Sequence, residues 1–161
     1  MDKLLTFVGD AGAIRLKIVQ TLCSAQKSAT LWQLAEAVVW KEIVPKSDEA
    51  MDLSLLLPLI SQVRTQLQHG LTLSVLLEHG MPRQELAAYF PSLKTAALDK
   101  MLPIAKNRRT PFFKRALDLL FEIELTAKNS SLEPSLIFDL LLTKITLLKR
   151  HYALSASQPA L

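Results

Sequence analysis

Apolar residues recur at helical spacing along most of this sequence, and no segment sustains the apolar–polar alternation of a β-strand. Only four glycines occur in 161 residues, and leucine and alanine, both good helix formers, dominate. The sequence therefore predicts an all-α fold, a helical bundle of about seven or eight helices. The clearest helical stripe lies in residues 113–127 and consists of Phe113, Ala116, Leu117, Leu120, Ile123 and Ala127.

Turn and capping residues divide the N-terminal part into two predicted helices. A glycine-containing turn at residues 9–12 precedes a helix over residues 14–22, and Thr30 is a candidate N-cap for a helix over residues 31–39. Trp40 falls just past the expected end of that helix. The polar, aperiodic stretch 41–52 predicts a linker.

A proline and a glycine bracket the next predicted helix. Pro58 is compatible with only the first turn of a helix, so we expect the helix to begin near Leu57. We expect Gly70 to end it. Two short helices then follow over residues 72–79 and 82–90, the first of them stopping at Gly80.

Two long helices are predicted in the C-terminal third, after a shorter one that Ser92 is expected to cap. Thr110 and Pro111 form a start signal for the first long helix, and Asn129 is its expected C′ residue. Pro134 is expected to open the last helix, whose apolar stripe continues to residue 148.

The residues that carry common enzyme chemistry are absent or isolated. Neither G-x-x-x-x-G-K-[ST] nor G-x-G-x-x-G occurs, so there is no phosphate cradle. Cys23 has no histidine nearby in sequence and fits a buried small side chain better than a nucleophile. His69, His79 and His151 sit near predicted helix C-termini, without partners at metal-ligand spacing. We expect no catalytic residue, metal or cofactor in this chain on its own.

Cysteine usage and hydropathy indicate a compartment. A single cysteine excludes an internal disulfide and suits a reducing cytoplasm. The N-terminus lacks the pattern of a signal peptide, and the longest apolar stretch, residues 53–60, is far shorter than the about 20 residues of a membrane span. We therefore expect a cytoplasmic chain without a membrane partner. The net charge of +4 permits an acidic partner without arguing for one.

Two features raise the question of DNA binding. Residues 79–101 could form a helix-turn-helix, but the candidate second helix offers only Arg83, Gln84 and Glu85 for base contacts, so ordinary bundle packing is favoured. The basic run KNRRTPFFKR could bind phosphate, although a solvated loop and helix start is the favoured reading. The basic residues of this run are Lys106, Arg108, Arg109, Lys114 and Arg115.

Glu124 and Lys128 continue the stripe of residues 113–127 with charged side chains. Their i, i+4 order, with the glutamate first, is the favourable one and contributes about 0.2 to 0.5 kcal/mol on an exposed helix. The pair is expected at the edge of the packing face, where it would steer contact with the last helix or with a neighbouring subunit. A solvated pair without such a role is the alternative.

The order of these features resembles a known family. The stretches KLLTFVGDAGAIRLKIVQTL, ATLWQLAEAVVW, LLPLISQVRTQL and residues 98–145 are similar to the C-terminal half of the delta subunit of the bacterial DNA polymerase III clamp loader. Trp32 belongs to the second stretch, the Gln62-x-Arg64 signature to the third, and the Glu124–Lys128 step to the fourth. The resemblance covers most of residues 3–148.

The resemblance implies fold, domains and partners. Residues 1–27 would be the end of a small helical lid, residues 28–152 a helical collar-like domain, and residues 153–161 a frayed tail. In that family the collar holds loader subunits together while other subunits hydrolyse ATP. This chain would therefore be a non-catalytic assembly module that packs against gamma/tau and delta-prime, with Gln62, Arg64, Trp32, Glu124 and Lys128 as candidate interface or register residues.

Two other functions stay open at this point. A basic helical DNA-binding domain would use the run of residues 106–115 and would bind more weakly as salt rises. A free-standing helical adaptor would bind proteins outside replication. Neither reading requires a small-molecule substrate.

Overall fold

The structure, a computed structural model, describes residues 31–41, 51–91, 93 and 95–156. These residues form five helices and no strand, so the all-α class is confirmed. The helix expected over residues 14–22 and the expected cap Ser92 lie outside the described residues. The helices are residues 31–40, α3 (Leu53–Glu78), α4 (Arg83–Tyr89), α5 (Thr95–Asn129) and α6 (Pro134–Ala156).

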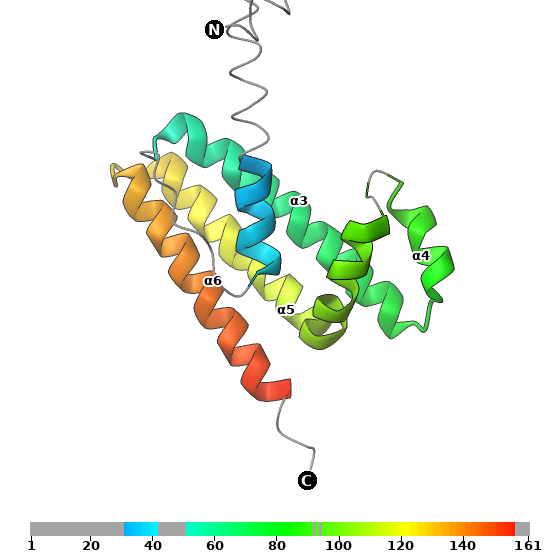
Figure 1. The fold of residues 1–161 in the computed structure, drawn as a ribbon. Coiled ribbons are helices and arrows are strands. Elements are labelled where there is room, and N and C mark those ends of the chain that lie inside the picture. Colours follow the sequence, from blue (N-terminus) through cyan, green and yellow to red (C-terminus); the bar gives the residue numbers. More distant parts are fainter. Residues whose placement is uncertain (1–30, 42–50, 92, 94, 157–161) are drawn as a thin grey trace, which may run out of the picture.

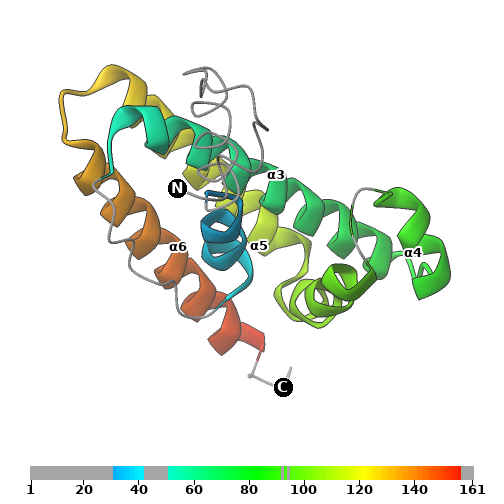
Figure 2. The ribbon, with the colours of Figure 1, turned by 45° about the horizontal axis from the view of Figure 1, so that its top comes forward.

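α5 is the central element of the bundle (Figure 1). Its second half runs antiparallel to α3 on one side and to α6 on the other, and Figure 2 shows the same order from a second direction. The helix of residues 31–40 packs over this layer, while α4 and the first half of α5 form one end. Phe112 and Phe113 are both fully buried and are the largest of the fully buried side chains in the core.

The predicted count of seven or eight helices is too high for the described residues, because two pairs of predicted helices each form one element: one pair across Gly70 in α3 and one pair across Arg109 in α5. α3 runs through Gly70, so the two helices expected over residues 57–69 and 72–79 are one. The reason lies across the interface: a Cβ atom on Gly70 would stand 2.1 Å from Cε1 of Phe113. Gly70 lets α5 approach α3 closely, and the buried ring offsets the low helix propensity of glycine.

The predicted start of α3 near Leu57 is wrong by one turn. Asp52 is the N-cap, and its carboxylate accepts a hydrogen bond from the backbone N–H of Leu55 at 2.9 Å. Pro58 consequently lies inside the helix, on its exposed side, and is not in the first turn. The local cap decides the boundary here.

The C-terminus of α3 is where the glycine signal predicted it. Gly80 has φ of +74°, and its N–H donates to the carbonyl of Leu77 at 3.0 Å. The N–H of Met81 donates to the carbonyl of Leu76 at 3.1 Å, which completes a Schellman motif.

α5 consists of two helical segments joined at Arg109, whose φ of 62° and ψ of 170° are not helical. Pro111 lies two residues later, in the first turn of the second segment, where its missing N–H costs no helical hydrogen bond, and the start agrees with the prediction from Thr110 and Pro111. Asn129 is the last helical residue of α5. α6 continues to Ala156, so residues 153–156 of the expected frayed tail are helical.

Candidate functional site

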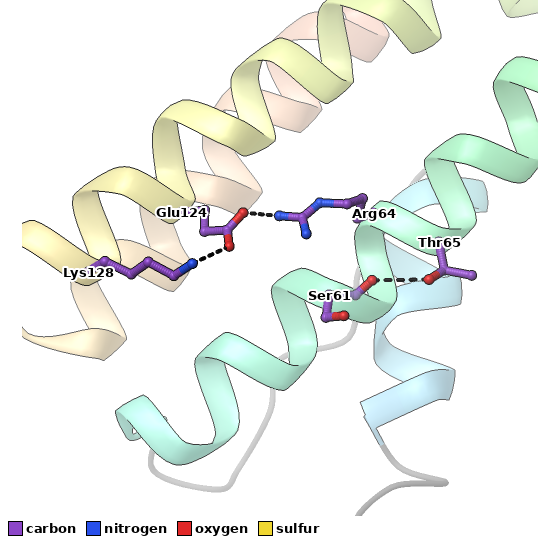
Figure 3. Close-up of polar contacts among 5 residues, drawn as sticks. All are labelled: Ser61, Arg64, Thr65, Glu124 and Lys128. Atoms are coloured by element: carbon purple, nitrogen blue, oxygen red, sulfur yellow. Dashed lines mark hydrogen bonds and ion pairs between the residues drawn. The ribbon is translucent and has the colours of Figure 1, made fainter.

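Arg64, Glu124 and Lys128 form a charged cluster on the flank where α3 meets α5 (Figure 3). Oε1 of Glu124 accepts a hydrogen bond from Nζ of Lys128 at 2.7 Å, and Oε2 accepts one from the guanidinium of Arg64. The Glu124 side chain is 17% exposed, against 38% for Arg64 and 54% for Lys128. Two cations that still reach solvent thus cover one carboxylate.

The positions of these residues follow from the helical period. Glu124 comes directly after buried Ile123, and Arg64 directly after buried Val63, so both stand at the edge of the stripe that their helix buries. One turn before Thr65, the carbonyl of Ser61 accepts a hydrogen bond from the Thr65 hydroxyl at 3.2 Å, a contact within α3 (Figure 3).

The Glu124–Lys128 pair was expected to contact the last helix or another subunit. Within the chain, the structure shows that its contact is with α3 and not with the last helix. Arg64 and Glu124 are separated by 60 residues in sequence. α6 receives a different contact from α5, since Nζ of Lys144 lies 3.6 Å from Oε2 of Glu122. Sequence spacing identified the pair within α5 but not the cation from α3.

The other two interface candidates stand apart from the charged cluster. Gln62 is half-buried on α3, and its side chain makes no hydrogen bond to another described residue. Trp32 is half-buried in the helix of residues 31–40. Trp40, expected just past that helix, is its last residue and is buried, with Nε1 donating to Oε1 of Gln66 at 2.7 Å.

Arg108 requires a correction, because it does not belong to an exposed basic patch. Its side chain is buried, with Nη1 donating to the carbonyl of Val39 at 2.5 Å and the guanidinium 4.9 Å from the centroid of the Phe112 ring. The spacing of the apolar stripe gave a signal for this, since Met101, Ala105 and Arg108 fall on one face of the first segment of α5.

Sequence reasoning missed a second buried cation, Lys149 of α6. Its Nζ donates to the carbonyl of Lys41 at 2.6 Å, just past the helix of residues 31–40. Arg108 and Lys149 therefore both bind carbonyls at the C-terminal end of that helix, where the macrodipole and the unpaired carbonyls favour cations. These two contacts fasten the helix to α5 and α6.

The remaining basic residues of the run, Lys106, Arg109, Lys114 and Arg115, are exposed. Lys106 and Arg109 line an open depression of about 650 Å³ together with Leu77, Glu78 and Asn107. The structure thus keeps four cations of the predicted patch on the surface and removes Arg108 from it.

Glu78 of α3 binds the start of the second segment of α5. Its carboxylate accepts from the backbone N–H of Thr110 at 3.0 Å and from the Thr110 hydroxyl at 2.9 Å. These hydrogen bonds lower the pKa of Glu78 below 4.5, and the charge of Arg109 acts in the same direction. A residue from another helix therefore acts as a cap where α5 breaks.

The histidines divide into two situations. Nδ1 of His79 lies 2.8 Å from the carbonyl of Val75 at the C-terminus of α3, consistent with the capping role expected for it. His69 is in the interior of α3, contrary to the expectation that Gly70 ends that helix, and burial lowers the pKa of its ring. Within the described ranges, no three His, Cys, Asp or Glu residues gather closely enough to hold a metal ion.

The helix-turn-helix candidate has a packing role in this fold. α4 buries Leu86, and Phe90 directly after it is also buried. Arg83, one of the few side chains available for base contacts, is ion-paired with Asp99 of α5. The pair links α4 to the first segment of α5.

Comparison of the chain with protein-family models, with curated proteins and with solved structures gave no significant match. Among the helices that the structure describes, none is long and apolar enough to cross a membrane. The class that fold and site define is an all-α bundle with a charged cluster between two of its long helices.

Proposed function

We propose that this chain is a non-catalytic, delta-like assembly module of a bacterial DNA polymerase III clamp loader, packing against other loader subunits through a collar-like bundle. The observation that carries the proposal is the Arg64–Glu124 ion pair. The two residues come from two separate stretches that resemble the collar of that family, and they are in contact. An ion pair that fixes how two collar helices align would require this contact.

The surface beside the charged cluster supports a protein partner. Phe121 and Leu125 lie one helical turn apart on α5 and expose 59% and 43% of their surface. They flank Glu124 and Lys128 on the outer side of the helix. Apolar side chains bordered by charged ones match the anatomy of subunit contacts, in which the apolar centre provides the affinity and the rim the orientation.

The proposed mechanism is subunit packing without chemistry on this chain. Arg64 and Lys128 neutralise the Glu124 carboxylate and present the cluster's excess positive charge at the edge of the contact. The partners would be gamma/tau and delta-prime, the other subunits that meet this chain in the collar.

A pull-down with the tagged chain tests the proposal. The wild-type chain should retain gamma/tau and delta-prime, and Phe121→Asp/Leu125→Asp should lose both. Tyr89→Asp is the matched control, because Tyr89 is 56% exposed on α4, away from the cluster. Recovery of neither subunit by the wild-type chain would overturn the proposal, and capture of unrelated proteins would favour the adaptor function.

A basic DNA-binding domain is the second candidate, and the exposure of Lys106, Arg109, Lys114 and Arg115 favours it. Binding to duplex or single-stranded DNA should weaken as salt rises, with a logarithmic slope of about 0.9 for each phosphate contacted in B-DNA. Lys114→Ala/Arg115→Ala should reduce that slope. Arg108 is unsuitable for this test because its replacement would disturb the core. An unchanged slope in the double variant would exclude this surface.

A further inference from the structure

The outer face of α6 carries a leucine seam that no other described element covers. Leu136, Leu140, Leu147 and Leu154 expose 55%, 38%, 58% and 72% of their surface. Together with Thr143 and Arg150 they follow intervals of four, three, four, three and four residues, which is the a/d spacing of a coiled coil. We call these six residues the α6 seam.

The seam is distinct from the face that α6 already uses. Ile137, Leu141 and Ile145 are buried in the core against α5. α6 is therefore apolar on two faces, and only one of them is satisfied within the described fold. Single exposed leucines are common on protein surfaces and need no explanation. Exposed leucines that repeat at heptad spacing over five helical turns instead indicate an interaction surface.

The charges beside the seam identify the occupant. Asp139 and Arg150 are both exposed and stand on the same side of the helix, 11 residues apart and opposite in sign. A second α6 lying antiparallel would place Arg150 against the Asp139 carboxylate of the first copy, and the two-fold axis would repeat the contact. A parallel copy would place like charges together, which disfavours that arrangement.

We propose that α6 pairs with α6 of a second copy of this chain, antiparallel and about a two-fold axis. In the a/d register of an antiparallel coil, Leu147 packs against Thr143, Leu140 against the stem of Arg150, and Leu136 against Leu154 of the other copy. The seam extends over about 27 Å of helix, long enough for five turns of knobs-into-holes packing. This contact goes beyond the proposed function and does not depend on it.

Sedimentation equilibrium of the full chain tests the contact, without any loader subunit present. The wild-type chain should show a concentration-dependent monomer–dimer equilibrium. Leu147→Glu should weaken self-association by about tenfold or more, because a carboxylate would be buried at the centre of the seam. Tyr89→Glu, an exposed aromatic on α4, should leave the equilibrium unchanged.

A charge exchange tests the antiparallel register and keeps the proposal falsifiable if Leu147→Glu unfolds the chain. Asp139→Arg and Arg150→Asp should each weaken the dimer, and the double variant should restore it, because the opposed pair is rebuilt with inverted signs. Failure of the double variant to restore association would overturn the antiparallel arrangement.

A wild-type chain that stays monomeric at its highest soluble concentration would overturn the proposal altogether. If Leu147→Glu then destabilised this monomer while Tyr89→Glu did not, the seam would be covered by another part of the same chain. If the wild-type chain does not self-associate but still retains loader subunits, this inference is refuted and the proposed function stands.

Discussion

The helix propensity of the local residue predicts the wrong outcome both at Gly70 in α3 and at Arg109 in α5. Gly70 lies in the middle of an unbroken helix, although glycine is a common stop signal. Arg109, a residue with good helix propensity, marks the break in α5. In both places the partner helix decides: Phe113 occupies the space that Gly70 leaves, and Glu78 caps Thr110 just past Arg109.

The difference teaches that a local signal is conditional on what lies opposite. At Gly70 the gain from a buried aromatic ring outweighs a propensity cost of about 1 kcal/mol. At Arg109 the backbone takes a positive φ that costs about 1 to 3 kcal/mol for a residue with a side chain. The hydrogen bonds from Thr110 to Glu78 and the proline at position 111 offset that cost.

The largest effect is expected at the close approach of α3 and α5. Gly70→Val should lower the free energy of unfolding by about 3 kcal/mol or more, because its side chain would overlap the Phe113 ring. Urea denaturation measures the change. Gly80→Ala is the control at an open position, and it should cost less, since only the backbone conformation there opposes a side chain. A Gly70→Val variant as stable as wild type would show that the helices can separate without penalty.

The next largest effect is expected beside the break, at the buried guanidinium of Arg108. Arg108→Met keeps much of the volume but leaves the Val39 carbonyl without this donor and removes the cation–π contact. Loss of a charged hydrogen bond should cost about 2 kcal/mol, measured by urea or thermal denaturation. Lys114→Met, at an exposed position of the same helix, should change stability little. Equal effects of the two substitutions would contradict the buried role.

Relief of the positive φ should stabilise the protein. Arg109→Gly is expected to raise the free energy of unfolding by about 1 kcal/mol, because glycine adopts this backbone region without steric cost. Arg109→Ala serves as the comparison, since it removes the same side-chain charge but keeps the Cβ atom. If both variants have the same melting temperature, the backbone conformation at this position carries no strain.

The smallest effect is expected from the carboxylate that caps the second segment of α5. Glu78 has its pKa lowered by hydrogen bonds from Thr110, so its contribution to stability is present above the unfolded value near 4.5. That contribution is lost as the pH falls from there through the folded pKa. Glu78→Gln should therefore reduce stability at neutral pH by less than Arg108→Met does.

The pH dependence provides the specific readout for Glu78. Denaturation curves recorded between neutral pH and the acid range should decline less steeply for Glu78→Gln than for the wild-type chain. Asp118→Asn, an exposed carboxylate elsewhere on α5, is the matched control. If stability falls equally with acid pH in the wild-type chain and in Glu78→Gln, the Glu78 cap does not stabilise the break in α5.

The part of the fold that sequence predicted is the part governed by periodicity and local capping. The helical class, the buried stripe of residues 113–127, the start at Thr110 and Pro111 and the end at Gly80 all follow from spacing and backbone chemistry. The start of α3 is also set by a local signal, the N-cap Asp52. The prediction was wrong because it placed Pro58 in the first turn and did not use Asp52 as the cap. One error in the helix count, at Gly70, depends on a contact with Phe113, 43 residues away.

The candidate site divides in the same way. The Glu124–Lys128 pair follows from i, i+4 spacing, while its third member, Arg64, comes from another helix and could not be placed by spacing. Arg108 was counted as a surface cation from its neighbours in sequence, although its position on the apolar stripe indicated burial. Lys149 gave the same positional signal, being four residues after buried Ile145.

By itself the sequence determined that this protein is helical, where its apolar faces lie and which charges stand beside them, because these depend on residues within one or two turns of each other. Only the tertiary structure decided whether a helix breaks at Gly70 or at Arg109, and which groups the buried cations bind. Both outcomes depend on the group opposite, a phenyl ring at Gly70, a carboxylate at Thr110 and helix-end carbonyls at Arg108 and Lys149. The chain brings those groups into contact only when the bundle packs.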